Sequence, residues 1–557
     1  MPVSPEIEVG RNRLLITASL FAVAFSVVAV RLVDVGLLAG PHDPRIAETQ
    51  NRATHQPGRA DIVDRNGVLL AANLKIASLY ANTRLIDEPD KAAARLRTVL
   101  PDEDPARLRK RLASGRAFIW LRRHLTPRQQ YAVNRLGIPG LEFRTEETRL
   151  YPAGRLTAHV LGHTDIDNHG IAGTESHFEK SLRRDAAPLR LTLDLRVQHV
   201  LRTELWRAMV RFKAIGAAGV VMDVSNGEVL SLVSLPDFDP KDANVADEQA
   251  RFNRATLGVY EMGSTFKIFT TAMALDSGKV TLRGGYDATK PIRVARFVIR
   301  DYHAKRRWLS VPEIFMYSSN IGAVKMALDV GIARQRTFMD RLGLLRPSPV
   351  ELSEIGAPLV PAKWREVNAM TISFGHGLAI SPVQLTAGVA AIINGGVLYP
   401  PTLRIRPAGE PLVGLRVISK RTSEQMRRLM RLVVKKGTGR KAAAKGYLVG
   451  GKTGTAEKVV GRRYRNKALM SSFVGAFPMT APRYVVFAML DEPTGTKQTN
   501  NFATGGWVAA PVVGAVISRI GPLLGVRPID EEAPETKRRM AIDIVTAKTG
   551  KRRLASF

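Results

Sequence analysis

The chain has 557 residues with a formal net charge of +33, and apolar residues make up 45% of it. This length predicts two to four folded units, and the composition is globular rather than disordered. The absence of cysteine excludes a disulfide framework, a thiolate metal site and a cysteine nucleophile. Basic residues recur along the whole chain instead of forming one dense block, which argues against specific nucleic-acid binding. We interpret them as a solvated surface, or as a surface that faces anionic lipid and a carboxylate-bearing polymer.

An uncharged apolar run covers residues 14–30 and is bracketed by Arg13 and Arg31. A helix of this length is about 26 Å long, slightly less than a hydrocarbon core of about 30 Å. The run is longer than the apolar core of a cleaved signal peptide, and Arg31 and Asp34 follow it where a small-residue cleavage site would lie. We therefore favour an uncleaved signal anchor over a signal peptide. The arginines before the run place the N-terminus in the cytoplasm.

The polar, strongly charged segment that follows, residues 45–188, contains no catalytic constellation. Asn66-Gly67 predicts a tight turn between two short apolar runs. Residues 104–135 predict a basic helical stretch. We interpret the segment as a separate N-terminal domain.

A new pattern begins near Leu189, where a strand and then an amphipathic helix are predicted up to residue 212. Ser225-Asn226-Gly227 predicts a hairpin, and residues 479–483 predict a second one far downstream. The residues between these two sets of strands are largely helical. The pattern predicts one antiparallel sheet that is built from both ends of the domain and flanked by helices, an α+β fold.

The first of three short motifs is GSTFK, which contains Ser264 and Lys267. Gly263 breaks the chain, and the residues after it predict a buried helix that ends near Gly278. Residues three apart share a helix face, so Lys267 is expected within reach of the Ser264 hydroxyl. A serine nucleophile needs a base, and a lysine can serve only if burial or another cation lowers its pKa. By itself the motif also fits an N-cap serine with a solvated lysine.

The second motif is SSN, with Ser318 and Asn320. Ser310 and Glu313 have capping-box spacing, which predicts a helix start, and a second helix is predicted from about Asn320. Both motif side chains are therefore expected at the joint between two helices. There a hydroxyl can relay a proton and an amide can hold a substrate carbonyl. By itself the motif also fits Asn320 as a simple N-cap.

The third motif is KTGT, which begins at Lys452 and is predicted on an exposed strand. The glycines in and before it, among them Gly454, let another backbone approach, so an extended peptide could add alongside. Lys452 supplies a cation, and Thr453 and Thr455 supply hydroxyl donors, which together suit a peptide carboxylate. The alternative is a glycine-rich bend in a sheet. In this order within one domain, the three motifs are the signature of penicillin-recognising serine enzymes.

With these motifs the chain resembles the class B penicillin-binding proteins, the monofunctional D,D-transpeptidases of bacterial wall synthesis. The resemblance covers roughly residues 51–512 and includes PGRADIVDRNGVLLA and YPAGRLTAHVLGHTDIDNHGIAGTE in the N-terminal half. Met262 stands where the family usually has proline, and Ala60 where it usually has glycine. These departures leave local loop geometry open and touch no catalytic group.

The resemblance implies a β-lactamase-like transpeptidase domain, an elongated pedestal domain of the dimerisation type and one transmembrane helix. We expect the protein to be a single-pass protein of the bacterial inner membrane with its catalytic domain in the periplasm. The expected segments are a cytoplasmic tail, a signal anchor, the pedestal, the transpeptidase domain and a basic C-terminal tail, at residues 1–13, 14–36, 45–188, 189–525 and 526–557.

The resemblance also implies the acyl-transfer chemistry. The donor is a peptidoglycan stem peptide ending in D-Ala-D-Ala, and β-lactams are covalent inhibitors. Lys267 takes the proton from Ser264, which attacks the penultimate D-Ala carbonyl. The backbone N–H groups of Ser264 and Thr455 form the oxyanion hole, and Ser318 passes a proton to the departing D-Ala.

Substrate binding is implied in the same way. Asn320 orients the donor peptide, and Lys452 with Thr453, Gly454 and Thr455 holds its carboxylate. No cofactor and no metal are expected, because the histidines that might suggest a metal site fall inside the pedestal resemblance.

A single span, a modest pedestal and no glycosyltransferase domain resemble most the division-specific, FtsI-type branch. The implied partners are an FtsW-like membrane glycosyltransferase and other division proteins. The elongation-specific branch is the near alternative. A carboxypeptidase or β-lactamase that passes the acyl group to water, and a non-enzymatic sensor on the same fold, also stay open.

Overall fold

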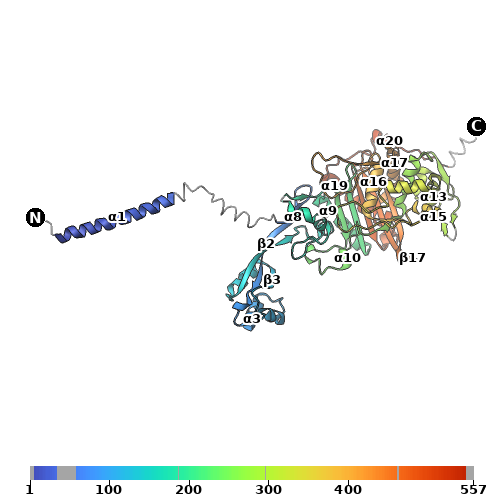
Figure 1. Ribbon diagram of the computed structural model, residues 1–557. Coiled ribbons are helices and arrows are strands. Elements are labelled where there is room, and N and C mark those ends of the chain that lie inside the picture. Colours follow the sequence, from blue (N-terminus) through green and yellow to red (C-terminus); the bar gives the residue numbers. More distant parts are fainter. Residues whose placement is uncertain (1–4, 34–57, 186, 295–296, 461–462, 547–557) are drawn as a thin grey trace, which may run out of the picture. The chain divides into compact units, whose positions relative to one another are not determined.

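The computed structural model describes residues 5–33, 58–185, 187–294, 297–460 and 463–546. The chain separates into two compact units, Met1–Gly58 and Arg59–Phe557. The described part of the first unit is one long helix, α1 (Pro5–Val33), drawn in blue in Figure 1. Its start at Pro5 extends the helix into the segment expected to be the cytoplasmic tail, and residues 34–36 of the expected anchor lie outside the described residues.

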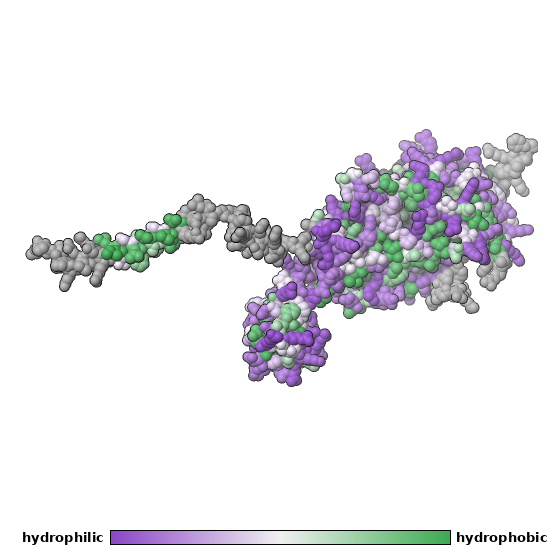
Figure 2. Space-filling view, viewed as in Figure 1, coloured by the Kyte–Doolittle hydropathy of each residue, from purple (hydrophilic) through white to green (hydrophobic). Residues whose placement is uncertain are grey.

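The apolar side chains of α1 are exposed from Leu15 to Val30, and Figure 2 shows them as a green stretch along the helix. Among the described residues, the helical stretch that is long and apolar enough to cross a membrane is Gly505–Leu523. The described apolar part of α1, Leu15–Val30, is shorter than this. Gly505–Leu523 is 56% buried and packs on the central sheet, so it has the surroundings of a core helix.

The pedestal part of the second unit is built around the long strand β2 (Leu69–Ala81), which pairs with β3 on one side and β4 on the other. The stretch 104–135, expected to be helical, contains a strand between two helices. The side chains of Ile119, Leu121 and Leu125 point into the small core of the pedestal. The alternation of apolar residues with a period of two therefore decides the structure here, and the basic composition does not. The remaining elements of this part are α3 (Pro89–Val99), α4 (Pro105–Leu112), β3 (Ile119–Leu125), α5 (Pro127–Arg135) and β4 (Leu141–Leu150).

A buried ionic cluster joins the two pedestal segments that carry the family resemblance. The Glu175 carboxylate is fully buried and accepts hydrogen bonds from Arg59 Nε at 2.6 Å and from Arg149 Nε at 2.7 Å. Arg149 also donates to the carbonyl of Ala60 at 2.8 Å. The arginine of PGR and the glutamate of GTE are thus partners in one network, although they lie far apart in sequence.

Short strands then connect the pedestal to the larger domain. β1 (Ile62–Val63) pairs with β2 through the predicted Asn66-Gly67 turn, where Asp64 N donates to Val68 O at 2.9 Å. On its other side β1 pairs in parallel with β5 (Leu189–Arg190).

The larger domain has the predicted antiparallel sheet with strands from both ends of the domain, in the order β16-β17-β18-β6-β7. Both predicted hairpins form, β6 with β7 and β17 with β18. β16 is an edge strand, as expected for the third motif. The strands are β6 (Gly216–Asp223), β7 (Val229–Leu235), β16 (Gly450–Val460), β17 (Arg463–Phe477) and β18 (Tyr484–Asp491).

Two hydrophobic cores lie on the two faces of this sheet, because successive strand residues alternate between them. Val221 and Phe473 belong to the core under α9 and α19, whereas Val220 and Val474 belong to the core under α11, α16 and α17. This is the expected α+β architecture, and Figure 1 labels α9, α16, α17 and α19 around the sheet. The bounds of these helices are α9 (Leu195–Arg211), α11 (Lys267–Asp276), α16 (Pro382–Ile393), α17 (Lys420–Lys436) and α19 (Ala510–Leu523).

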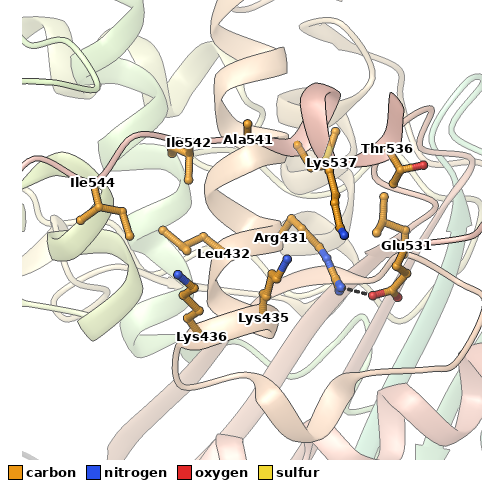
Figure 3. Close-up of a pocket in the computed structure, with 12 residues that line it drawn as sticks. Arg431, Leu432, Lys435, Lys436, Glu531, Thr536, Lys537, Ala541, Ile542 and Ile544 are labelled. Atoms are coloured by element: carbon orange, nitrogen blue, oxygen red, sulfur yellow. Dashed lines mark hydrogen bonds and ion pairs between the residues drawn. The ribbon is translucent and has the colours of Figure 1, made fainter. Parts of the chain in front are cut away.

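The segment expected to be a basic tail folds onto this domain as far as it is described. Arg431 of α17 pairs with Glu531 at 2.5 Å, and Met540 and Ile542 pack against the large core. Figure 3 shows the small cavity of about 170 Å³ that remains between α17 and this segment, with the Arg431–Glu531 pair at its side. The helix α20 (Pro534–Met540) lies in the described part of this segment.

Candidate active site

The turn that presents Ser264 precedes the helix predicted for the first motif. Ser264 lies in a single 3₁₀ turn, η5 (Gly263–Phe266), and α11 continues from Lys267. Gly263 has φ +54°, and a Cβ there would lie only 2.5 Å from the carbonyl oxygen of Thr455. Gly263 N also donates to Gly375 O at 3.1 Å. The turn is therefore held between β16 and the Gly375 loop, and glycine is required by both its conformation and its close contact.

The second motif forms the predicted joint between α12 (Val311–Tyr317) and α13 (Asn320–Val330). The capping box predicted from Ser310 is present. The N-cap of α13 is Ser319, whose hydroxyl accepts from Gly322 N at 3.0 Å. The interpretation of Asn320 as a simple N-cap is therefore wrong, because its side chain is directed elsewhere.

The third motif lies on β16, but its side chains are less accessible than an exposed strand implies. Lys452 is fully buried, and Thr453 is buried with its hydroxyl 2.8 Å from the hydroxyl of Thr438. Thr455 Oγ accepts from Gly505 N at 3.1 Å. A Cβ at Gly454 would lie 2.7 Å from Met262 O, so glycine lets β16 approach the turn that carries Ser264.

The first two motifs meet at the Lys267 amine, and the third joins them through the Ser318 hydroxyl. Its Nζ lies 2.9 Å from Ser264 Oγ, 2.7 Å from Asn320 Oδ1, 2.7 Å from Ser318 O and 3.1 Å from Ser318 Oγ. Lys452 Nζ reaches the same Ser318 hydroxyl from β16, at 2.9 Å. The five residues expected to be catalytic thus form one hydrogen-bonded cluster. Thr453, Gly454 and Thr455 continue from it along the sheet edge.

Burial lowers the pKa of both lysines. It lowers the pKa of Lys267 to about 7, and the nearby Asp301 carboxylate partly opposes this by raising the pKa. The pKa of Lys452 is also lowered, first by burial and then by the positive charge of Lys267. Near neutral pH, Lys267 is therefore available as an uncharged amine.

The neighbours of Lys267 determine which way its lone pair points. Ser318 O and Asn320 Oδ1 can only accept hydrogen bonds, so the two N–H groups of the neutral amine satisfy them. The lone pair is then left for a hydroxyl donor, and the Ser264 hydroxyl at 2.9 Å is nearer to it than the Ser318 hydroxyl at 3.1 Å. This is the arrangement that a general base needs before it removes the serine proton.

Sequence reasoning missed three residues that support this cluster. Asp301 binds the N-terminus of α13, Thr438 meets Thr453, and Gly505 packs so closely that a Cβ there would lie 2.4 Å from Gly454 O. Asp301 and Thr438 stand in basic segments without a recognisable motif. The Gly505-Gly506 pair was the one available signal, because paired glycines often mark a close backbone approach.

A serine hydroxyl within hydrogen-bond distance of a buried lysine of lowered pKa, with a second buried lysine on a sheet edge, is the arrangement of a serine acyltransferase of the penicillin-binding type. The sequence matches the family described as penicillin binding protein transpeptidase domain over residues 217–518 and the penicillin-binding protein dimerisation domain over residues 54–186. The chain belongs to this family and is an enzyme of its serine acyltransferase class. The exact boundary between the two domains, expected at residues 188 and 189, stays a prediction.

Relatives of known name agree over most of the chain. The probable peptidoglycan D,D-transpeptidase FtsI of Caulobacter vibrioides is 42% identical over 483 residues, which cover 84% of this chain and 82% of that protein. The peptidoglycan D,D-transpeptidase FtsI of Escherichia coli K12 is 30% identical, and the match covers 93% of this chain and 92% of that protein.

Solved structures share the fold. Penicillin-binding protein 3 of Mycobacterium tuberculosis, complexed with aztreonam, superposes with a TM-score of 0.67 at 24% identity, covering 85% of this chain and 97% of that one. The transpeptidase domain of Burkholderia pseudomallei penicillin-binding protein 3 has a TM-score of 0.55 at 34% identity. The match covers 61% of this chain and 98% of that one.

Proposed function

We propose that the protein is a peptidoglycan D,D-transpeptidase that forms peptide cross-links at the division septum through an acyl-enzyme on Ser264. The observation that carries the proposal is the position of Lys267 Nζ, which lies 2.9 Å from Ser264 Oγ. The amine is held there by Ser318 O and Asn320 Oδ1 of the second motif, two oxygens that can only accept hydrogen bonds. The FtsI-type relatives support the division role over the elongation role.

Acylation begins with proton transfer from Ser264 Oγ to the neutral amine of Lys267. The serine oxygen attacks the penultimate D-Ala carbonyl of the donor stem. Negative charge develops on that carbonyl oxygen, and the backbone N–H groups of Ser264 and Thr455 stabilise it. Loss of one such donor typically costs about 10² to 10³ in rate. The close approach of Gly263 to the Thr455 backbone supports this role, because it holds the two segments together.

Departure of the terminal D-Ala needs a proton at its nitrogen. Ser318 is suited to supply it, because its hydroxyl lies within hydrogen-bond distance of both lysine amines and can be reprotonated from either. The carboxylate of the leaving D-Ala binds Lys452 and the threonines of the third motif. Asn320 orients the donor peptide. The acyl group then passes to an amine of a second stem, which closes the cross-link, and β-lactams acylate Ser264 in place of the donor.

We place the catalytic domain in the periplasm, with α1 as a single-pass anchor in the inner membrane. The exposed apolar side chains of residues 15–30 support the anchor, because such a surface is stable in lipid and unstable in water. An FtsW-like membrane glycosyltransferase and other division proteins are the proposed partners.

The test is covalent labelling of the purified full-length protein in detergent with fluorescent penicillin. The wild type should form an adduct that survives denaturation, and Ser264→Ala should form none. Ser277→Ala, at the C-terminal end of α11, is the matched serine control and should label normally. An adduct that persists in Ser264→Ala would overturn the assignment of the nucleophile. A fluorescent fusion that follows the side wall instead of the septum would overturn the division role.

A further inference from the structure

An aspartate outside the three motifs holds the joint between α12 and α13. Asp301 follows β11 (Phe297–Ile299) and precedes β12 (Trp308–Ser310). Its carboxylate accepts three hydrogen bonds from the start of α13, from Asn320 N at 2.6 Å, from Ile321 N at 3.0 Å and from Ser319 Oγ at 2.7 Å. A carboxylate in this place satisfies helix N–H groups that otherwise have no partner within the helix and complements the positive end of the helix dipole.

The same segment also fixes the orientation of the Asn320 amide. Asn320 Nδ2 donates to Arg300 O at 2.9 Å, and a carbonyl oxygen accepts only from a donor. The amide oxygen must therefore face the other way, where it accepts from Lys267 Nζ at 2.7 Å. A flipped amide would place two acceptors together at Arg300 and two donors together at Lys267.

The joint needs such support because its backbone is strained. Ser318 has φ +61° and ψ +45°, the left-handed region, which is unfavourable for a residue with a side chain. In this conformation the Ser318 carbonyl points at Lys267 Nζ, 2.7 Å away. Both pure acceptors of the lysine thus depend on a strained turn whose far side is bound by Asp301.

We propose that Asp301 is a positioning residue for acylation. By binding Ser319, Asn320 and Ile321, it keeps the joint in the one geometry that directs both N–H groups of Lys267 away from Ser264. It touches neither the serine nor the substrate and acts through the second motif. The proposal rests on Ser264 being the nucleophile.

The negative charge of Asp301 has a second, separable consequence. The ionisable groups that act electrostatically around Lys267 are Asp301, Lys452 and His376. Of these, Asp301 raises the pKa of Lys267. Removing its charge should therefore lower the pKa of Lys267, so that the amine stays neutral to a lower pH. The lost charge moves the pH profile, and the lost hydrogen bonds reduce the maximal rate.

The experiment measures the rate of labelled-penicillin acylation from pH 5.5 to 9 on the full-length protein in detergent, together with thermal unfolding. The variants are Asp301→Asn, which keeps part of the hydrogen bonding, Asp301→Ala, which keeps none, and Ser319→Ala, which keeps the charge. Asp287→Asn is the matched control, because Asp287 ends the strand β9 (Gly285–Asp287), which pairs with β12, and its carboxylate binds Thr289 instead of the joint.

The maximal rate should fall at least about tenfold in Asp301→Ala and less in Asp301→Asn. In both variants the acid limb should move to lower pH by the same amount. Ser319→Ala should lower the maximal rate with the limb unmoved, and Asp287→Asn should change neither. A wild-type rate and limb in the Asp301 variants would overturn the inference. So would a rate loss that follows unfolding while the limb stays in place.

If both Asp301 variants fail to fold, Ser319→Ala decides, and a wild-type rate there overturns the inference. Failure of the proposed function is distinguishable, because the wild-type protein itself would then form no adduct at Ser264.

Discussion

Lys452 Nζ lies 2.9 Å from Ser318 Oγ, which joins the edge strand of the sheet to the joint between two helices across 134 positions of sequence. The contact places the Lys452 amine at a wall of the site that both elements form. Lys452 is fully buried, so a substrate group must enter the site to reach its amine. A carboxylate that binds there brings the adjacent peptide bond toward the serine.

Removal of this amine should therefore weaken the binding of substrates through their carboxylate. We expect Lys452→Ala to lower the rate of acylation by penicillin about 10² to 10³-fold, because a buried carboxylate without its cation loses several kcal/mol. The measurement compares penicillin with its methyl ester, which has no charge to lose. Equal losses for the two compounds would contradict a carboxylate-binding role.

The base role of Lys267 can be tested by a change that keeps the positive charge. Lys267→Arg places a guanidinium that stays protonated at any accessible pH and cannot accept the Ser264 proton. We expect acylation to fall at least about 10³-fold. Lys325→Arg on α13 is the control, because Lys325 donates to Asp287 O outside the site, and its rate should be that of the wild type. A Lys267→Arg protein that acylates at near-normal rate would exclude lysine as the base.

The pH profile of acylation should have an acid limb near pH 7. The pKa of Lys267 is lowered to about 7, so the amine is protonated and inactive below that pH and neutral above it. The rate should therefore fall with decreasing pH, about tenfold per unit well below the midpoint. Stopped-flow or quenched labelling across pH 5.5 to 9 gives the midpoint. A midpoint near pH 10, the ordinary range of lysine, would show that the buried site does not hold a neutral amine.

The sequence predicted the groups that carry the chemistry better than the groups that hold them. Ser264, Lys267 and Lys452 stand in short patterns, so their convergence could be expected from motif order alone. The N-cap of α13 could not be predicted, because Ser319 and Asn320 are both good cap residues. What decides between them is that Ser319 Oγ accepts from Gly322 N, whereas Asn320 Oδ1 accepts from Lys267 Nζ.

The fold could likewise be predicted only where the sequence carries a local pattern. The two hairpins and the sheet with strands from both ends of the domain were predicted from such patterns, and the structure confirms them. The strand Ile119–Leu125 was hidden, because its apolar alternation is interrupted by Arg122, Arg123 and His124. Its pairing with β2 is a long-range interaction that a local pattern cannot supply.

The pedestal should depend on its buried ionic cluster for stability. Glu175→Ala would leave Arg59 and Arg149 buried without their shared carboxylate, and we expect a loss of about 3 to 5 kcal/mol in the free energy of unfolding. Glu88→Ala, which removes an exposed partner of Lys91, is the control and should have little effect. Chemical denaturation of the full-length protein in detergent, followed by intrinsic fluorescence, measures both. Equal stabilities of the two variants would mean that the cluster contributes no more than a surface pair.

A comparison of two glycines with left-handed backbone distinguishes the effect of conformational strain from that of close packing. Gly263 and Gly278 have φ +54° and +71°, but a Cβ at Gly263 would lie 2.5 Å from Thr455 O, whereas one at Gly278 meets nothing within 4 Å. Both alanine variants should lose about 1 kcal/mol or more of stability from the backbone. Only Gly263→Ala should also push the Ser264 turn away from β16. Its acylation rate should then fall at least about tenfold, while Gly278→Ala labels as the wild type does. Equal rates in the two variants would show that the contact between the turn and the strand is not needed for acylation.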